Sequence, residues 1–491
     1  MTTITGAFLR GPGAEMLPTS GPFDVFLESG EIADIAPAGV LRPRGEILDA
    51  AGRFLIPGLW DHHVHTTQWA LTAQRADLGG AESAAHAARL VAASDLVPDG
   101  RRVGAGYRDA LWAETPTLAL LDELTGETPT YLLNADAHSM WLNSAAQRRE
   151  GISTEADGIL REEPAFEVSK RLNAVDPDVG DRLVTRMAKE AASRGVVGIV
   201  DLDMAWNEES WMRRLAAGFD TLRVEFGVYP DLLPRALAEG LRTGDPVRGA
   251  DSDLVTVGPL KVITDGSLGT RTAAVTHPYD GHDHGLLTVR PAELRELMAA
   301  ATAGGLRCAI HAIGDEANSR ALDAFAATGA WGSIEHAQLV AHADIPRFAR
   351  LGVAASVQPE HALDDRDMAD ALWAGQTSIA YPMRSLVDAG ATLLLGSDAP
   401  VSPLDPWAAI AAAVFRARDG REPWRPEETV DAMTALGAST RAGSASPDAL
   451  TPGAPADIAM CDIDPMTADD PALRAMRVSA TLLAGRLTYG G

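Results

Sequence analysis

Four apolar segments follow one another in the C-terminal half of the chain, and stretches with helical periodicity separate them. Glycines such as Gly329 and Gly352 mark the ends of the expected helices. Strands that are apolar along their whole length are typical of a parallel sheet buried on both faces. The expected strands occupy residues 306–313, 333–337, 353–358 and 391–396. In a chain of 491 residues, this α/β alternation favours a (β/α)8 TIM barrel over a doubly wound sheet.

The two ends of the chain show a different pattern, with short strands and no helices between them. Near the start, two alternating segments flank the turn dipeptide Ser29-Gly30, and near the end similar segments flank Ala484-Gly485. Neither end has enough strands for a stable sheet alone. We therefore predict a small β-sandwich domain from residues 1–56 and 447–491, and a barrel from residues 57–446. The irregular region of about 69–192 is interpreted as an insertion after the first barrel strand.

The charge of the chain restricts its partners. The formal net charge is −26 at pH 7, which repels phosphate backbones and anionic lipid surfaces. Nucleic acid and membranes are therefore excluded as expected partners, and a small-molecule substrate is favoured. The sequence leaves open whether the chain forms a homo-oligomer.

Targeting signals and cysteines give two further expectations. The first residues lack a basic stretch followed by an apolar run, and no segment reaches the length of a membrane span, which predicts a cytoplasmic protein. Cys308 and Cys461 cannot form a disulfide framework and lack the spacing of a thiolate metal site. We expect both to be small buried side chains.

The segment Asp61-His62-His63-Val64-His65 follows an apolar run and predicts a metal site. Side chains two residues apart on a strand point to the same side, so His63 and His65 can present two imidazoles to one point. Asp61 shares that face and is expected to orient a ligand, whereas His62 points into packing. The alternatives are an exposed histidine cluster and a shifted register in which His62 is the ligand.

Three further polar residues stand at the ends of predicted strands. They are His311, His336 and Asp398. The carboxyl ends of parallel barrel strands meet at one mouth, where active sites of such barrels are assembled. Imidazole and carboxylate ligands suit a divalent metal, for which zinc is the first expectation and manganese, nickel or iron are alternatives. The pattern predicts one or two ions.

Lys261 follows another apolar run and is expected at the same mouth. A buried lysine beside two cations loses its proton, because burial and like charge both lower its pKa. The neutral amine could then react with carbon dioxide to give a carbamate that bridges two metals. Two alternatives remain: Lys261 acts as a charged clamp for the substrate, or Glu162 is the bridging ligand.

Two other patterns are set aside. His282 and His284 form a second His-x-His pair, but the surrounding aspartates and glycines mark a loop. A nicotinamide-dependent oxidoreductase is disfavoured because no GxGxxG motif opens a first strand-to-helix turn.

These motifs resemble those of the amidohydrolase superfamily, specifically family 3 with its YtcJ-like branch, which includes N-substituted formamide deformylases. The resemblance runs nearly from end to end and includes Pro57-Gly58 before the first histidines and Asn143-Ser144 after residue 142. Two positions depart from the family pattern: Ala137 stands where the family usually has glycine, and Trp60 where it has an aliphatic residue. The matching segments are residues 57–65, 134–144, 158–162, 261–273, 311–315, 334–338, 356–359, 396–400 and 452–458.

The resemblance implies a ligand set. His63 and His65 would bind one metal, which Asp398 completes. His311 and His336 would bind a second, and Lys261 would bridge the two. It also implies a metal-dependent hydrolase that cleaves an amide-type C–N bond of a small molecule, such as an N-formyl or N-acyl amine, with metal-activated hydroxide.

In this scheme Asp398 takes a proton from the attacking water and passes it to the leaving nitrogen. The alternatives are a deaminase or cyclic amidase of the same superfamily, and a non-catalytic binding protein on the same barrel.

Four residues in the matching segments are candidate substrate contacts: His138, Trp141, Arg271 and Gln358. They are polar or aromatic groups that could reach the pocket. The alternative is that they hold loops together. Arg271 in particular could bind a carboxylate or pair with Asp265.

Overall fold

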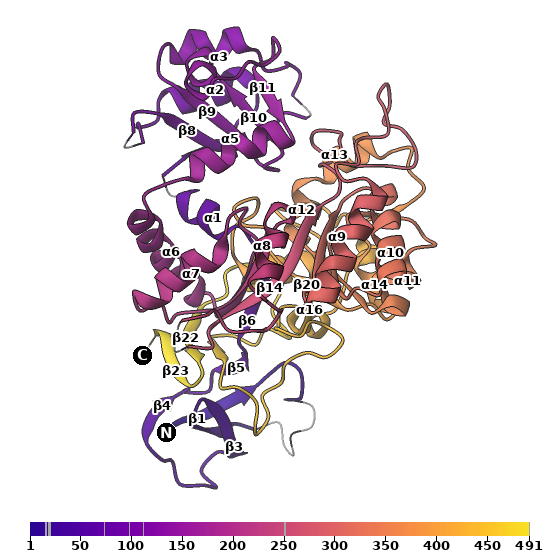
Figure 1. The fold of residues 1–491 in the computed structure, drawn as a ribbon. Coiled ribbons are helices and arrows are strands. Elements are labelled where there is room, and N and C mark those ends of the chain that lie inside the picture. The colour runs from indigo at the N-terminus through magenta and orange to yellow at the C-terminus, as the bar shows by residue number, and fades with distance from the viewer. Residues whose placement is uncertain are drawn as a thin grey trace.

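The structure is a computed structural model that describes residues 1–14, 17, 21–72, 74–97, 99–110, 112–249 and 252–490. It has three parts arranged in a row (Figure 1). A barrel forms the middle. A sheet that contains both chain ends lies on one side of it, and a separate α/β unit lies on the other.

Eight parallel strands form the barrel sheet in the order β20-β18-β16-β15-β14-β13-β12-β6. A parallel bridge between Val64 and Ala399 joins the first strand to the segment after the last and brings the two edges together. The predicted (β/α)8 barrel is confirmed. The strands are β6 (Leu59–Val64), β12 (Val196–Asp201), β13 (Arg223–Val228), β14 (Val255–Ile263), β15 (Cys308–Ala312), β16 (Gly332–His336), β18 (Val353–Val357) and β20 (Leu393–Leu395).

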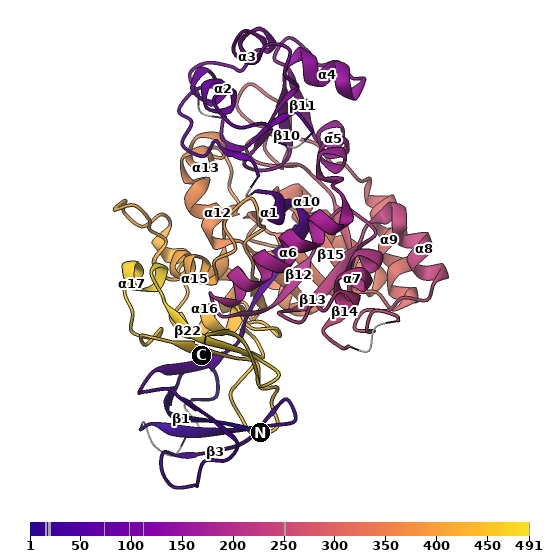
Figure 2. The same ribbon diagram turned by 90° about the vertical axis from the view of Figure 1, so that its left-hand side faces the viewer.

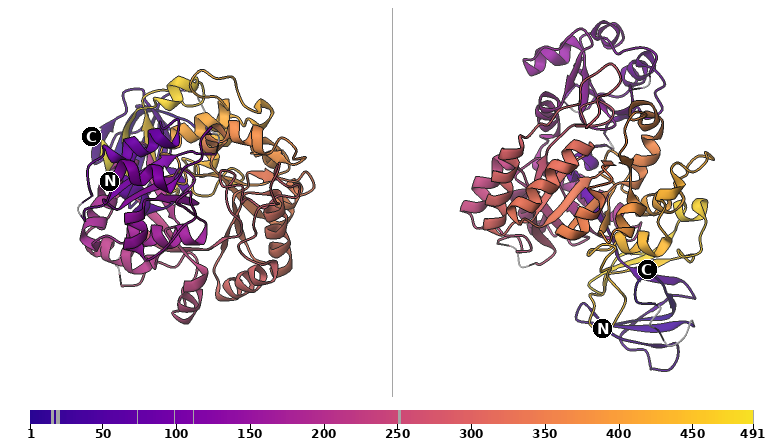
Figure 3. Two further views of the ribbon diagram at one scale, coloured as in Figure 1. Left: turned by 90° about the horizontal axis from the view of Figure 1, so that it is seen from above. Right: turned by 90° about the vertical axis from the view of Figure 1, so that its right-hand side faces the viewer.

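Helices cover the outside of this sheet, and several end at glycines in the left-handed conformation, such as Gly329 and Gly352. The view from above shows α9 to α11, in pink to orange, as an outer row (Figure 3). The helices of the barrel region are α1 (Thr66–Thr72), α6 (Pro177–Ala192), α7 (Asn207–Ala216), α8 (Leu233–Ala238), α9 (Pro291–Gly304), α10 (Asp315–Thr328), α11 (Ile345–Leu351), α12 (Pro359–Asp364), α13 (Arg366–Leu372), α14 (Met383–Asp388), α15 (Pro406–Phe415) and α16 (Ala432–Ala438). A small ladder joins β17 (Leu339–Val340) to β19 (Ile379–Ala380).

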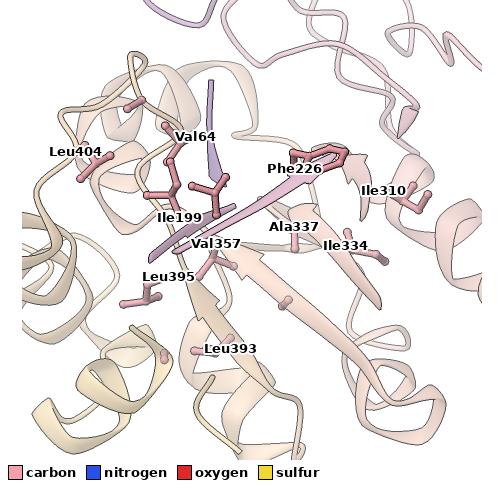
Figure 4. Close-up of a cluster of buried hydrophobic side chains, with 14 of the residues drawn as sticks. Val64, Ile199, Phe226, Ile310, Ile334, Ala337, Val357, Leu393, Leu395 and Leu404 are labelled. Carbon is pink, nitrogen blue, oxygen red and sulfur yellow. The ribbon is translucent and has the colours of Figure 1, made fainter. Parts of the chain in front are cut away.

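The main hydrophobic core lies between the strands and these helices. Ile199, Ile310 and Ile334 come from three barrel strands (Figure 4) and belong to one buried cluster with Met298 and Phe325 of the helices. This packing fixes the strand ends, because close-packed cores resist displacement. The mouth of the barrel is therefore a rigid base for the side chains that project from it.

Both chain ends contribute to one eight-stranded sheet, as predicted. One buried cluster unites Val25 and Leu27 from the start of the chain with Met460 and Leu482 from its end. The strands are β1 (Thr2–Leu9), β2 (Phe23–Glu28), β3 (Glu31–Pro37), β4 (Glu46–Asp49), β5 (Phe54–Pro57), β21 (Ile458–Cys461), β22 (Val478–Leu483) and β23 (Arg486–Gly490), and α17 (Asp470–Arg474) lies between β21 and β22.

The insertion is an α/β unit on the opposite side of the barrel (Figure 2). Its five-stranded sheet has the order β11-β10-β9-β8-β7. This sheet starts at Ala76 and ends at Arg161, whereas α6 packs on barrel strand β12, so the unit is shorter than the expected range of 69–192. Its elements are β7 (Ala76–Asp77), α2 (Ala84–Ala92), β8 (Arg102–Tyr107), α3 (Leu118–Thr125), β9 (Thr130–Asn134), β10 (Ser139–Leu142), α4 (Ser144–Glu150), β11 (Ile159–Arg161) and α5 (Glu163–Asn173).

Two smaller expectations can be compared with the structure. Within the described ranges, no helix combines the length and the apolar character needed to span a membrane. Cys308 and Cys461 are both buried and free, as predicted.

Candidate metal centre and substrate pocket

All six side chains proposed as metal ligands line one pocket at the C-terminal mouth of the barrel. They are His63, His65, Lys261, His311, His336 and Asp398. Four of them lie on barrel strands β6, β14, β15 and β16, whereas His65 directly follows β6 and Asp398 lies in the segment after β20. Because parallel strands all end at this mouth, residues far apart in the chain meet there.

The tightest group consists of His63, His336 and Asp398. Each offers one ligand atom, and these atoms lie within 4.8 Å of one another. His65 lies beside them, with its Nε2 atom 3.2 Å from Oδ1 of Asp398. The backbone of both His336 and Asp398 is left-handed, with φ of 74° and 57°. Such strained conformations cluster at functional sites, where the surrounding structure holds them.

His311 is the neighbour of this group. Its ring centroid lies 4.5 Å from that of His336. The ring of His63 lies 5.5 Å from that of His65 and 4.9 Å from that of His336, and Asp398 lies within 4.0 Å of all three.

The side chains present fit a divalent metal. Three of their buried atoms have no hydrogen-bond partner in the described part of the chain: Nδ1 of His65, Nε2 of His311 and Oδ1 of Asp398. Asp398 lies close to His65, but the contact lacks hydrogen-bond geometry. Buried polar atoms are rarely left without a partner, and imidazole nitrogens and a carboxylate oxygen are suitable zinc ligands.

Lys261 is buried in the same pocket, with Nζ 3.3 Å from Nε2 of His63. Burial lowers the pKa of Lys261 to about 8, although Glu335 and Asp398 act in the opposite direction. A minor fraction of the amine is therefore neutral near neutral pH, far more than for an exposed lysine.

Glu162 does not occupy the bridging position. One of its carboxylate oxygens accepts a hydrogen bond from Nδ1 of His138, and the other from the hydroxyl of Thr272. It is absent from the residues that line the metal pocket. Its position does not support the alternative in which Glu162 is the bridging ligand.

Side chains behind the histidines fix their orientation. Nδ1 of His63 donates a hydrogen bond to Glu335 at 2.8 Å, and Nδ1 of His336 donates one to Gln358 at 2.9 Å. Although Glu335 is buried, the hydrogen bond from His63 lowers its pKa to about 2. The contact with Glu335 leaves Nε2 of His63 facing Asp398, 3.5 Å from Oδ1. Sequence reasoning missed Glu335, although it directly precedes His336.

Asp61 and His62 differ in their roles. Oδ1 of Asp61 accepts the backbone N–H groups of His63 and Ser397, so it joins β6 to the segment after β20. The expectation that Asp61 orients an imidazole ligand is therefore wrong. His62 contacts the carbonyl oxygen of Thr440, away from the metal pocket. The shifted register with His62 as ligand is therefore wrong.

We expect Glu335→Gln to weaken metal binding by about 10-fold to 100-fold, because the partner behind a ligating histidine fixes its orientation and raises its basicity. Competition with a chelator measures the affinity. Glu225→Gln is the matched control, since Glu225 is a buried barrel carboxylate that pairs with Arg307 and contacts no proposed ligand. Equal affinities in wild type and Glu335→Gln would contradict this role.

The four expected substrate contacts have different positions. His138 lines the pocket. Gln358 instead orients His336. Arg271 does not line the metal pocket or the pocket beside it, and it does not pair with Asp265, which accepts the backbone N–H groups of Ala274, Ile313 and Gly314. For Gln358 and Arg271, a direct substrate contact is not supported.

The prediction for Trp141 is wrong. Its side chain is fully buried in the core of the insertion with Leu121 and Leu132. Its ring lies against Gly158, where an added Cβ atom would approach within 3.1 Å. The aromatic residue in this motif therefore holds the insertion together.

Trp141→Ala should destabilise the protein by about 3–5 kcal/mol, because the change leaves a cavity in a packed core. Thermal or denaturant unfolding measures this loss. The control is Trp331→Ala, which removes a tryptophan that is 43% exposed and should change stability by no more than about 0.5 kcal/mol. Similar stabilities of the two variants would refute the core position.

Ala137, one of the two departures from the family pattern, lies in the wall of the metal pocket. Its φ is 60°, in the left-handed region that favours glycine. The backbone geometry thus explains why glycine suits this position, and the alanine adds a methyl group to the pocket wall.

Fold and site together define a barrel protein with a candidate metal centre at its C-terminal mouth. The sequence profile described as the amidohydrolase family matches residues 46–489, and the chain belongs to this family. The family resemblance predicted from the motifs is confirmed, and membership makes the chain a hydrolase.

Three relatives cover most of the chain. It is 28% identical to protein LONG AFTER FAR-RED 3 of Arabidopsis thaliana, over 79% of this chain and 73% of the relative. It is 25% identical to YtcJ of Bacillus subtilis, over 91% of each chain, and YtcJ is named as an amidohydrolase on provisional grounds. It is 26% identical to the N-substituted formamide deformylase of Arthrobacter pascens, over 95% and 94%.

The fold also matches a solved structure. An uncharacterized metal-dependent hydrolase from Pyrococcus horikoshii superimposes with a TM-score of 0.79 at 24% identity, over 96% of this chain and 99% of that one. This likeness supports the fold.

Proposed function

We propose that this chain is a metal-dependent hydrolase that cleaves an amide-type C–N bond of a small molecule, such as an N-formyl or N-acyl amine. The observation that carries the proposal is the convergence of His63, His336 and Asp398 within 4.8 Å at the barrel mouth. The name of the Arthrobacter relative, a deformylase of N-substituted formamides, supports this class of bond.

The proposed ligand sets are those that the family resemblance implies. His63, His65 and Asp398 would hold one divalent ion, for which zinc suits the donors, and His311 and His336 would hold a second. When bound, such ions supply Lewis acidity, which activates water and polarises a substrate carbonyl.

Asp398 is the group proposed to move the proton. Its carboxylate is buried next to His63 and His65. Asp398 lines both the metal pocket and a second pocket that adjoins it. A carboxylate in this place can accept a proton from the attacking water and release it to the leaving nitrogen. Acid–base transfer of this kind contributes about 10²-fold to 10⁴-fold to a rate.

His138 is proposed to bind the substrate carbonyl. Burial lowers the pKa of His138, but the Glu162 carboxylate outweighs this effect and raises it to about 9. His138 is therefore a cation at neutral pH. Since it also lines the pocket, it can donate a hydrogen bond to an oxygen on which negative charge develops.

Lys261 is proposed to carry a carbamate. Its neutral amine would attack the carbon of carbon dioxide to form an N–C bond, and a proton would leave to the solvent. The lowered pKa of Lys261 and the position of Nζ beside His63 support this proposal, and the family resemblance implies that the carbamate would bridge the two ions.

If Lys261 carries a carbamate, the zinc-loaded protein equilibrated with 13C-bicarbonate should give a 13C NMR signal from the carbamate carbon. Lys261→Met should remove that signal and reduce turnover. Lys189→Met, which removes another lysine outside the pocket, should keep both. A wild-type spectrum without a carbamate signal would contradict the modification and leave the histidine sites unaffected.

The activity is tested with the zinc-reconstituted protein and a panel of N-formyl amines, N-acyl amines and cyclic amides. We expect release of an amine together with formate or another acid from at least one class. Release of ammonia from a heterocycle, without amide cleavage, would replace the proposal with a deaminase.

A further inference from the structure

A second pocket adjoins the metal pocket and is here called the outer pocket. The residues that line both pockets are Asp136, His138, His311, His336, Asp398 and Val401. The outer pocket extends to loops of the insertion and to α12 and the segment after it. A substrate with its scissile bond at the metal centre would place the rest of its structure there.

One wall of the outer pocket carries two carboxylates, Asp109 and Asp136. Asp109 accepts a hydrogen bond from Nδ2 of Asn134 at 2.9 Å, and Asp136 accepts one from the hydroxyl of Ser267 at 2.6 Å and one from the backbone N–H of His138 at 2.9 Å. These donors are neutral. Within the described ranges neither carboxylate forms a salt bridge.

The cations next to this wall already have partners: Nδ1 of His138 lies 2.9 Å from the Glu162 carboxylate. Arg108 also lines the pocket, but its guanidinium contacts Asp364 at 3.0 Å. Burial and the charge of Asp136 raise the pKa of Asp109, which shows that the two carboxylates repel each other. A cation placed between them would relieve this repulsion.

Two unpartnered polar atoms point to a ligand independently of these charges. His361 and Gln338 line the outer pocket and are at least nine-tenths buried. Nε2 of His361 and Oε1 of Gln338 have no hydrogen-bond partner among the residues that the structure describes. Because such atoms are costly when left unpaired, a bound polar group is the natural partner.

The lining also has an apolar part that suits an alkyl chain, beside polar residues such as Ser267 and Asp365. The apolar part includes Leu268, Ile313 and Met368. The imidazole of His361 stacks on that of His336, with centroids 6.2 Å apart. The unpartnered nitrogen of His361 therefore belongs to a ring that neighbours the metal centre.

From this arrangement we propose that the outer pocket binds a substrate arm that ends in an ammonium group, held between Asp109 and Asp136. Gln338 and His361 would contact polar atoms of the same substrate closer to the scissile bond. The inference rests on the proposed function, because it assigns the substrate class of that site.

Two ketones that contain no hydrolysable C–N bond test this proposal by binding alone. The probe is 8-aminooctan-2-one, and its neutral counterpart is nonan-2-one, in which a methyl group replaces the ammonium group. Calorimetry on the zinc-loaded full chain should give a dissociation constant about 10-fold lower for the amine, a preference that falls as salt screens the charges. Equal affinities would overturn the proposal.

Substitution of each aspartate tests where the ammonium group of the ketone binds. Asp109→Asn and Asp136→Asn should each reduce the ratio of the two affinities by several-fold while the affinity for nonan-2-one stays within about two-fold. Glu114→Gln is the control, since Glu114 is an exposed carboxylate close in sequence to Asp109 that does not line the pocket. An unchanged ratio in both aspartate variants would overturn the assignment.

Hydrolysis of N-(5-aminopentyl)formamide and N-hexylformamide separates this inference from the proposed function. If neither compound releases formate but the amine-bearing ketone binds preferentially, the proposed reaction fails and the binding site stands. If both are hydrolysed with equal kcat/KM and the ketones bind equally, the reaction stands and the ammonium site fails.

Discussion

Asp398→Asn should lower turnover by about 10²-fold to 10⁴-fold, the range that acid–base catalysis contributes. The amide can still offer an oxygen to a metal, but it cannot accept a proton from water at neutral pH. Metal content should therefore fall far less than kcat. Parallel measurements of kcat and of bound metal per chain test this separation.

Two outcomes would contradict the role of Asp398. Full activity of the variant would remove the residue from catalysis. An equal loss of metal and turnover would reduce its role to that of a ligand.

His63→Ala should abolish measurable hydrolysis and weaken metal binding by more than about 10²-fold. His63 belongs to the tightest group of ligand atoms, and Glu335 holds its ring in place. Removing one ligand leaves a site that is incomplete for zinc. Equilibrium dialysis against a metal buffer measures the affinity.

The neighbouring His62 provides a matched control. His62→Gln keeps a donor that can reach the carbonyl oxygen of Thr440, and it leaves the metal pocket unchanged. We expect near wild-type metal affinity for this variant. A larger loss in His62→Gln than in His63→Ala would mean that the register of β6 is assigned to the wrong histidine.

The barrel could be predicted because its strands are apolar along their length. Burial on both faces makes segments such as 353–358 distinct from amphipathic helices, and the glycines between them mark helix ends. The extent of the insertion was harder to predict. Helix α6 has the same amphipathic pattern whether it packs on the insertion or on β12, so local periodicity does not decide its position.

The candidate ligands could be predicted because each follows an apolar strand, and strand ends of a barrel share one mouth. The hydrogen bonds that hold these ligands in place could not be predicted from the sequence. The hydrogen bond between His63 and Glu335 depends on how β6 and β16 face each other across the barrel, which neither segment encodes alone. For the same reason, the role of Gln358 as a partner of His336 emerged only from the structure.

Trp141 and His361 show a second limit of sequence reasoning. A motif identifies residues that are important, but not whether they contact the ligand or the core. Trp141 fills the core of the insertion, whereas His361, at the start of α12, lines the outer pocket and was not identified. Its place two residues after the segment 356–359 was the available signal.

The central claim is that these side chains bind metal together at the barrel mouth. Crystals of the zinc-reconstituted protein, measured at wavelengths on both sides of the zinc absorption edge, test it most directly. We predict an anomalous difference peak within bonding distance of His63, His65 and Asp398, the first proposed ligand set. A fully zinc-loaded protein whose peaks lie elsewhere, with this pocket empty, would contradict the account.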